Sequence, residues 1–294
     1  MILAIIYVVT FTLVWVAPGS PFNTSERTLT PEVEQALRQK FNAESPVGFL
    51  TYYPIRMLQG DFGPSFNNPN QDVDEIIRER LPVSAALGAL AVVIALVVGV
   101  IVGSLAAVRR DGPLDWASTG VALAGVSVPS FVAAAVLLAV FGFWLNWLPF
   151  DQWDWRPSQM IMPAVALSLL PMAYVTRLTR VSMIDTLSAD YVRTARAKGV
   201  SRPKVIGKHA LRNAVLPVLS FIGPAAASTM VGSFVVEKVF QIPGLGQMFV
   251  TSVQNRDQTL ILGVVMIYSV LLLALNLLVD VLYTVVDPRI EVSS

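Results

Sequence analysis

The sequence contains no cysteine, and this absence excludes several kinds of site at once. Without a thiol the chain has no disulfide framework, no thiol nucleophile and no cysteine ligand for a metal ion. A single histidine, His209, is too little for a histidine-rich metal site. The Gly-x4-Gly-Lys-Ser/Thr pattern of a phosphate loop is also absent, so the chain does not hold ATP by that route.

Charged residues are scarce as well: they make up 14% of the 294 residues, whereas hydrophobic residues make up 54%. The mean hydropathy is +0.63. This balance is typical of a polytopic membrane protein and argues against a soluble globular domain. The formal net charge of +1 says little about partners, because the charges are segregated along the chain.

Six apolar stretches predict an all-α membrane protein with six transmembrane helices, since a helix needs roughly 20 apolar residues to cross the bilayer. We expect the spans at about 1–17, 83–108, 116–150, 157–176, 213–236 and 260–279. The third stretch carries no charge from Trp116 up to Asp151, which favours tilt, a kink at Pro129 or an interfacial tail. No span has a carboxylate or a base at mid-depth, which argues against a proton-coupled carrier and an intramembrane peptidase.

Small residues and prolines inside the spans predict close packing and bends. Gly99 and Gly103 have the four-residue spacing that lets two helices approach closely. Pro163 and Pro171 are expected to kink the fourth span. The Gly223–Pro224 pair and Gly232 are expected to bend the fifth, which we expect to line a pathway.

Residues 18–82 are predicted to form a small extracytoplasmic insertion. Thr30 as a cap and Pro31 in the first turn predict a helix over 30–40. Residues 60–70 are rich in Gly, Pro and Asn and are predicted to be a loop. A second short helix is expected from Asp74 to Arg80, ending near Pro82. Residues 237–258 are expected to form an outer loop.

Loop charges predict the orientation. Arg109 and Arg110 follow the second span, and residues 177–212, which follow the fourth, hold nine Lys or Arg against two acidic residues. Because such basic loops stay on the cytoplasmic side, we expect both termini in the cytoplasm. Glu237 and Asp280 lie at span ends, where we expect water to reach them.

The basic segment, residues 177–212, carries the signals of two short helices. Ser188 is placed to cap the first, which has Asp190 in its first turn, and Gly199 is placed to end it in a left-handed conformation. Ser201 is placed to cap a second helix that leads into the fifth span.

The same segment has small residues, Ala195, Ala197 and Gly199, that would let another protein approach the backbone. From charge alone, binding of anionic lipid headgroups explains the segment equally well. A docking helix pair between membrane spans indicates a transport subunit that another protein drives.

The stretch Tyr191-Val-Arg-Thr-Ala-Arg-Ala-Lys-Gly199 resembles the cytoplasmic EAA loop of ABC-importer permeases. In the general pattern Glu-Ala-Ala is followed by three residues and Gly. Here the triplet reads Arg193-Thr194-Ala195, so only the second Ala and Gly199 match. These departures are similar to the peptide- and nickel-type branch of the family.

Further motifs of that branch occur in order along nearly the whole chain. They are Ala17-Pro-Gly-Ser-Pro21, Gly60-Asp-Phe-Gly63, Glu79-Arg-Leu-Pro82, Val128-Pro-Ser-Phe131, His209-Ala-Leu-Arg-Asn213, Phe240-Gln-Ile-Pro-Gly-Leu-Gly246 and Val286-Asp-Pro-Arg289. Members usually begin with an arginine-rich lead that has no counterpart here, which favours a truncated chain or a misassigned start codon.

The resemblance implies a type I ABC-importer permease fold and its domain organisation. The implied parts are a first transmembrane helix (1–17), an extracytoplasmic segment (18–82), a transmembrane domain (83–287) with a coupling loop at about 182–212, and a cytoplasmic tail (288–294). The residues implied to contact an ATPase are Tyr191, Arg193, Thr194, Ala195, Lys198 and Gly199.

The resemblance also implies a function and a set of partners. The chain would be a cell-membrane permease subunit, without enzymatic activity or a cofactor of its own, in contact with lipid and not with nucleic acid. It would pair with a paralogous permease, two ATP-binding subunits that bind ATP and Mg, and an extracytoplasmic solute-binding protein. A di- or oligopeptide is the expected substrate, with nickel chelates, glutathione and oligosaccharides left open. A secondary carrier that works alone is the alternative from another class.

Overall fold

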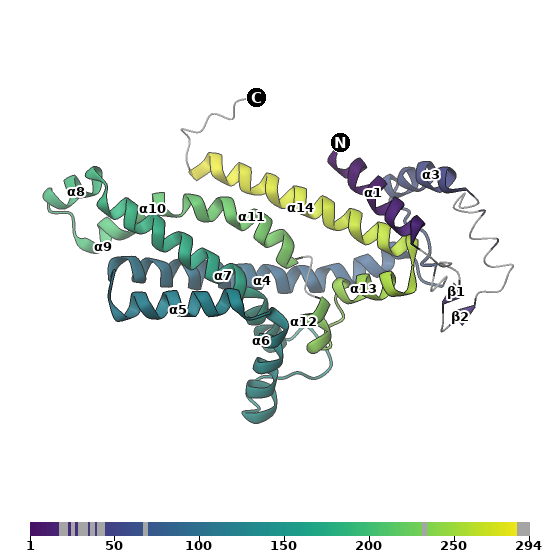
Figure 1. Cartoon of the computed structure of the whole chain (residues 1–294), viewed down its shortest axis with the longest axis horizontal. Coiled ribbons are helices and arrows are strands. Elements are labelled where there is room, and N and C mark those ends of the chain that lie inside the picture. Colours follow the sequence, from purple (N-terminus) through teal and green to yellow (C-terminus); the bar gives the residue numbers. More distant parts are fainter. Residues whose placement is uncertain are drawn as a thin grey trace. The chain divides into compact units, whose positions relative to one another are not determined.

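The computed structural model describes residues 1–17, 23–24, 27–28, 35, 39, 45–66, 70–230 and 234–286, with the backbone alone for 23–24, 27–28 and 282–286. The described chain is helical, which confirms the expected all-α membrane fold, apart from one short antiparallel hairpin of β1 (Asn23–Thr24) and β2 (Arg27–Thr28) (Figure 1). Most of the predicted helix over 30–40, Gly232 and residues 287–294 lie outside the described residues.

The chain forms two compact units, Met1–Ala85 with Pro243–Leu271 and Ala86–Ile242 with Leu272–Ser294. The first unit contains these helices: α1 (Ile2–Val16), α3 (Pro46–Leu58), the beginning of α4 (Val73–Val108), α13 (Leu245–Asn255) and the beginning of α14 (Gln258–Val286). The α3 helix begins at Ser45, whose Oγ accepts a hydrogen bond from the Gly48 amide at 3.0 Å, and Pro46 occupies its first turn.

Aromatic side chains form the core of the first unit. Its buried members come from α1, α3, the loop before α4 and α14: Tyr7, Phe11, Phe49, Tyr53, Phe66 and Leu262. The Phe49 and Tyr53 rings stack with centroids 4.9 Å apart. Aromatic rings bury a large apolar area each, so a few of them are enough to join α1 to the rest of this small unit.

A buried carboxylate joins the loop before α4 to the start of α14. Asp257 is 1% exposed and accepts hydrogen bonds from the amides of Phe66 at 3.2 Å and Leu260 at 3.1 Å. It also pairs with the Ser65 hydroxyl. These donors satisfy the buried charge and cap the first turn of α14 at the same time.

The second unit contains the remaining helices. They are the rest of α4 and α14, α5 (Pro113–Ser127), α6 (Ser130–Leu137), the π-helix η1 (Leu138–Trp144), α7 (Pro157–Ser188), α8 (Asp190–Ala197), α9 (Arg202–Lys204), the π-helix η2 (Val205–Ala210), α10 (Leu211–Ala214), α11 (Leu216–Met230) and α12 (Phe234–Val239). The helices α5, α6, α10, α11 and α12 all pack against α7. In Figure 1, α7 runs alongside α5 for most of the length of α5.

The glycine pair predicted to allow close packing lies between α4 and α7. A Cβ atom on Gly99 would come within 2.7 Å of Val175 Cγ1, and one on Gly103 within 2.5 Å of the Thr176 carbonyl oxygen. Both distances are shorter than a van der Waals contact, so α7 can lie where it does only because these two positions lack a side chain. The prediction of close packing is confirmed.

Among the described residues, three helices are long and apolar enough to cross a membrane: α4, α7 and α14. Two further stretches pass the same criterion if each bent pair is one span, namely α5 with residues 130–144 and residues 202–214 with α11. The first predicted span, residues 1–17, coincides with α1, whose 15 residues extend roughly 22 Å. The helices therefore lie where the apolar stretches predicted them.

Two proline predictions meet different outcomes. The short helix predicted to end near Pro82 does not end there, because α4 runs through that proline from Val73 to Val108. The proline removes one backbone hydrogen bond, but Ile77 and Val83 on either side of it are buried, so packing holds the helix continuous. The kink at Pro129 is confirmed as a 105° bend, with Val128 in the extended conformation that a following proline favours.

Residues 237–258, predicted as a loop, are largely helical. The α13 helix begins after Gly244, and its first amide, Leu245 N, donates to Ser84 Oγ at 2.9 Å. A cap from so distant a residue cannot be seen in the local sequence.

Glu237 is 1% exposed, so the prediction that water reaches it is wrong. It belongs to α12, which packs against α6 and α7. Asp280 is exposed, as predicted.

The segment between η1 and α7 is held by charged hydrogen bonds. Asp151 accepts from Gln159 Nε2 at 3.0 Å and from Arg156 Nη2 at 2.7 Å, and Arg156 Nε also donates to Asp154 at 2.7 Å. The hydrogen bonds from Gln159 and Arg156 hold the pKa of Asp151 below its ordinary value.

The packing of α4 on α7 predicts a difference between two glycine substitutions. Gly103→Ala should lower the free energy of unfolding by about 1–3 kcal/mol, because the added methyl group meets backbone atoms of α7. Gly120→Ala, on α5 with no atom within 4 Å of the added Cβ, should leave stability unchanged or raise it slightly. Unfolding of the purified variants in detergent micelles compares the two; equal effects would contradict the role of Gly103.

Candidate functional site

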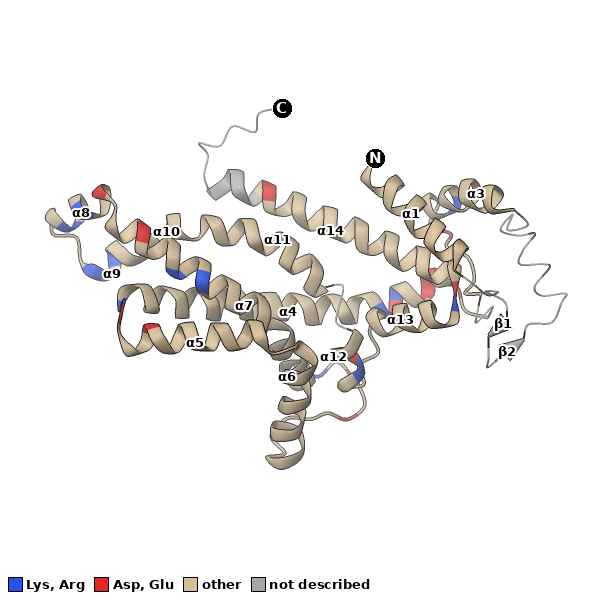
Figure 2. Ribbon diagram, viewed as in Figure 1, with Lys and Arg blue, Asp and Glu red and all other residues tan. Residues whose placement is uncertain are grey.

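The basic segment, residues 177–212, begins in the last part of α7 and continues as the short helices that follow it. Figure 2 shows Lys and Arg gathered over α8, α9 and the adjoining end of α7, whereas α11 between α10 and residue 230 is free of them. Asp190 lies in the first turn of α8 and Arg196 in its last, the arrangement that a helix dipole favours.

The cap predicted at Ser188 is wrong. Ala189 is the residue between α7 and α8, with an extended backbone at φ −67° and ψ 149°, and no side chain caps α8. The Ser188 hydroxyl instead donates to the Asp185 carbonyl oxygen at 2.7 Å, one turn back in α7. The continuation of α7 by one residue moves Ser188 out of the cap position and uses its hydroxyl within that helix.

Gly199 ends α8 as predicted. Its φ is +78°, and its amide donates to the Arg196 carbonyl oxygen at 3.0 Å. The next amide, Val200 N, donates to Ala195 at 3.2 Å. A Cβ atom on Gly199 would meet no atom within 4 Å, so the backbone conformation alone requires glycine here.

Tyr191 connects α8 to the helix that follows the basic segment. Its hydroxyl accepts from Asn213 Nδ2 at 2.7 Å and lies 3.3 Å from the His209 carbonyl oxygen, to which it donates. Val192, the next residue, is fully buried. Polar and apolar contacts together therefore hold α8 against η2 and α10.

The residues predicted for docking lie together on α8 and its end. Five of them are exposed: Tyr191, Arg193, Thr194, Lys198 and Gly199. Ala195 is half-buried. Arg193 lies 3.5 Å from Asp190, a pair of two exposed groups that adds little stability. The segment thus presents an exposed, basic helix with a small residue near its middle.

The second helix begins at Ser201, as predicted, although no side-chain hydrogen bond caps it. Pro203 lies in its first turn, where proline needs no hydrogen-bond partner. The helix continues through η2 and α10 and bends by 52° into α11. Its apolar residues Ala210 and Ala214 are buried against Ala107 of α4 and Met183 of α7.

An ion pair with a buried carboxylate joins the start of α5 to the part of α7 that belongs to the basic segment. Arg180 Nη2 lies 2.7 Å from Asp115 Oδ2, and a second bond, from Nε to Oδ1, makes the pair bidentate. Asp115 is 4% exposed and also accepts from the Asp111 amide at 3.0 Å, in the turn between α4 and α5. One carboxylate therefore fixes both the turn and the distance between two helices.

Residues 99–292 match the family model described as binding-protein-dependent transport system inner membrane component. The chain belongs to this family. The match covers the helices from α4 to α14, including the whole basic segment, so the helix pair α8–α9 is part of a binding-protein-dependent permease.

Relatives of the permease are similar over nearly their full length. The dipeptide transport system permease protein DppB of Bacillus subtilis is 43% identical over 98% of this chain and 93% of its own. The oligopeptide transport system permease protein OppB of Escherichia coli is 42% identical, over 98% and 95%. DppB of Lactococcus lactis subsp. cremoris is 41% identical, over 98% and 95%.

A solved structure shares the fold of the permease. It is described as the crystal structure of an amino acid ABC transporter with histidines. The TM-score is 0.53, with 19% sequence identity, over 71% of this chain and 92% of that chain. At this identity the similarity establishes the fold of the helices and nothing about the ligand.

Sequence reasoning did not find the Asp115–Arg180 pair of the permease. Arg180 was counted among the basic residues of the segment, and Asp115 lies just before the expected start of the third span at Trp116. The one sequence feature that could have indicated the pair is an acidic residue directly before an uncharged span, because such a residue needs a basic partner when it is buried.

Removal of the Asp115 charge should destabilise the permease. Asp115→Asn leaves Arg180 without its partner and should lower the free energy of unfolding by about 1–3 kcal/mol. The matched control is Asp111→Asn, because the Asp111 carboxylate pairs with Arg110 at 3.6 Å on the surface, and its φ of +63° is one that asparagine tolerates. Thermal unfolding in detergent should show a loss for the first variant only, and equal losses would contradict the argument.

Proposed function

We propose that this chain is the membrane-spanning permease subunit of an ATP-driven, binding-protein-dependent importer of di- or oligopeptides. It forms half of the translocation pathway. The observation that carries the proposal is the similarity, at 41–43% identity over 98% of the chain, to permeases whose names specify dipeptide or oligopeptide transport. The names of these relatives favour a peptide over a nickel chelate, glutathione or an oligosaccharide.

The partners of the proposed importer are those of the family. A paralogous permease forms the other half of the pathway, a solute-binding protein delivers the peptide from outside, and two cytoplasmic subunits bind ATP and Mg. The gathering of Lys and Arg over α8 and α9 supports a cytoplasmic position for these helices, with both termini on that side (Figure 2). This chain forms part of the pathway and changes its conformation, and the ATP-binding subunits hydrolyse ATP.

The contacts of α8 support its role as the element that receives the movement of the ATP-binding subunits. Tyr191, Arg193, Thr194, Lys198 and Gly199 form the exposed part of the docking surface, with Ala195 between them. Tyr191 is hydrogen-bonded to Asn213 of α10, and Val192 is buried. A push on α8 therefore moves α10 and the helix that follows it, rather than α8 alone.

The end of the same helix supports the docking role. The left-handed turn at Gly199 stops α8 after eight residues, so the chain reverses into α9. The α8 helix then packs against η2, which continues α9. ATP-driven closure of the partner subunits would move these helices and shift the pathway between inward- and outward-facing states.

A reconstitution experiment tests the proposed function. The complete assembly in proteoliposomes should accumulate a di- or tripeptide with ATP, whereas this chain alone should neither accumulate it nor hydrolyse ATP. In the assembly, Ala195→Cys should crosslink to the ATP-binding subunit, and Gln254→Cys, on exposed α13, should not. Uphill uptake by this chain alone under a proton gradient would instead favour a secondary carrier.

Substitutions of Gly199 separate backbone conformation from side-chain bulk. Gly199→Val should lower peptide uptake and peptide-stimulated ATP hydrolysis together, because a β-branched residue at φ +78° costs about 1–2 kcal/mol and unwinds the turn. Gly199→Asn should retain most of both activities, since asparagine tolerates this conformation. Membrane insertion should be unchanged in both. Normal coupling in the valine variant would remove Gly199 from the mechanism.

A further inference from the structure

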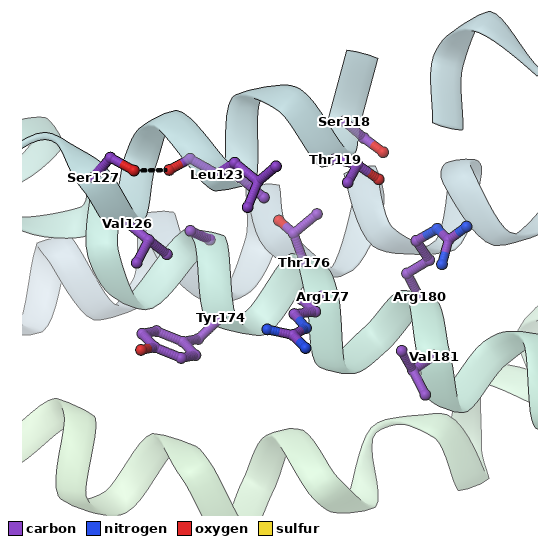
Figure 3. Close-up of a pocket in the computed structure, with 12 residues that line it drawn as sticks. Ser118, Thr119, Leu123, Val126, Ser127, Tyr174, Thr176, Arg177, Arg180 and Val181 are labelled. Carbon is purple, nitrogen blue, oxygen red and sulfur yellow. Dashed lines mark hydrogen bonds between the residues drawn. The ribbon is translucent and has the colours of Figure 1, made fainter. Parts of the chain in front are cut away.

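A pocket of about 530 Å³ lies between α5 and α7 in the second unit. Its walls combine apolar residues, such as Leu123, Val126 and Val181, with hydroxyl groups and two arginines (Figure 3). A pocket with few polar groups in apolar walls is typical of a binding site for a small molecule, because the walls exclude water and the polar groups orient the ligand.

The two arginines of the pocket differ in their partners. Arg180 is neutralised by Asp115, as described above. Arg177, one turn earlier on α7, forms no ion pair or hydrogen bond with any residue that the structure describes, and its side chain is exposed. In Figure 3 its guanidinium group is turned toward Tyr174 and away from Arg180. The pocket therefore holds one uncompensated positive charge.

Hydroxyl groups of the pocket can still accept hydrogen bonds. Thr176 Oγ1 donates to the Met172 carbonyl oxygen at 2.8 Å, and Ser127 Oγ donates to that of Leu123 at 2.8 Å, the bond drawn in Figure 3. Each hydroxyl uses its hydrogen within its own helix, and its oxygen lone pairs remain. The pocket thus offers a cation together with acceptors, which suits an anion that is attached to N–H groups.

A second pocket adjoins the first at Tyr174. The Tyr174 and Phe221 rings lie with centroids 5.3 Å apart, joining α7 to α11. Tyr174 also lines a pocket of about 430 Å³ between α6, α7 and α11, which includes Ser130 and Ser228. Because Tyr174 belongs to both pockets, Arg177 lies beside a series of two cavities.

We infer that Arg177 binds the C-terminal carboxylate of the transported peptide in the α5–α7 pocket, an inference that rests on the proposed function. A guanidinium group matches a carboxylate in shape and charge, and apolar walls strengthen the contact. Every peptide with an unmodified end carries this group beside amide N–H donors, whatever its sequence. A site that binds only this carboxylate can contact every such peptide, whatever side chains the peptide carries.

The test uses the complete transporter in proteoliposomes of neutral phosphatidylcholine. Uptake of trialanine is compared with uptake of its C-terminal amide, each supplied well above its separately measured Kd for the solute-binding protein. The wild type should import the free acid about tenfold or more faster than the amide, because the amide lacks the charge that forms the hydrogen-bonded contact with Arg177. Arg177→Gln should import both at the same, lower rate.

Two further variants make this result specific to the pocket. Arg177→Lys keeps the charge and should keep most of the preference for the free acid. Arg109→Gln removes an exposed arginine at the end of α4, outside the pocket, and should behave as the wild type. Recovery of each assembled transporter in equal amount shows that folding is unaffected.

Three outcomes would overturn the inference. If Arg177→Gln discriminates between the acid and the amide as the wild type does, Arg177 does not read the carboxylate, although the proposed function stands. If the effect of Arg177→Gln appears only in vesicles with anionic phosphatidylglycerol, and equally for both peptides, its ligand is a lipid phosphate. If the wild type imports neither peptide, the proposed function fails together with the inference.

Discussion

The close approach of α4 and α7 is the contact on which the second unit depends. Gly99 and Gly103 allow it, since a side chain at either position would overlap atoms of α7. In a lipid environment helices gain little from hydrophobic burial against each other, so van der Waals contact between backbones has to supply the stability. Once α7 lies against α4, the positions of α5, α6, α10 and α11 follow, because all of these helices pack on α7.

The same helix carries the parts of the proposed mechanism. Along α7 lie Tyr174 and Arg177 of the pocket, then Arg180 of the buried ion pair, and finally Ser188, where the helix ends and α8 begins. A displacement of α8 therefore acts on a helix that also forms one wall of the pocket. The Asp115–Arg180 pair joins α5, the other wall of the pocket, to the same helix.

Some features could be predicted because their cause lies within a few residues. Gly199 ends α8 in a left-handed turn, the bend follows Val128–Pro129, and Ser201 begins the second helix, each as local backbone preferences require. Predictions failed where contacts with distant residues decide. Ser84 caps α13, α12 lies against α6 and α7 with Glu237 covered, and α4 continues through Pro82. None of these causes can be read from neighbours in the sequence.

The sequence by itself determined the membrane class, the positions of the apolar helices and the basic segment, because hydropathy and charge act through composition and spacing alone. Its motifs also determined the family, which full-length relatives then established. Only the tertiary structure decided which charges are paired. Arg177 and Arg180 are equivalent in the sequence, but α5 brings Asp115 to Arg180 and leaves Arg177 beside the pocket. Partner choice between two arginines depends on where another helix, α5, places its carboxylate, and packing alone sets that position.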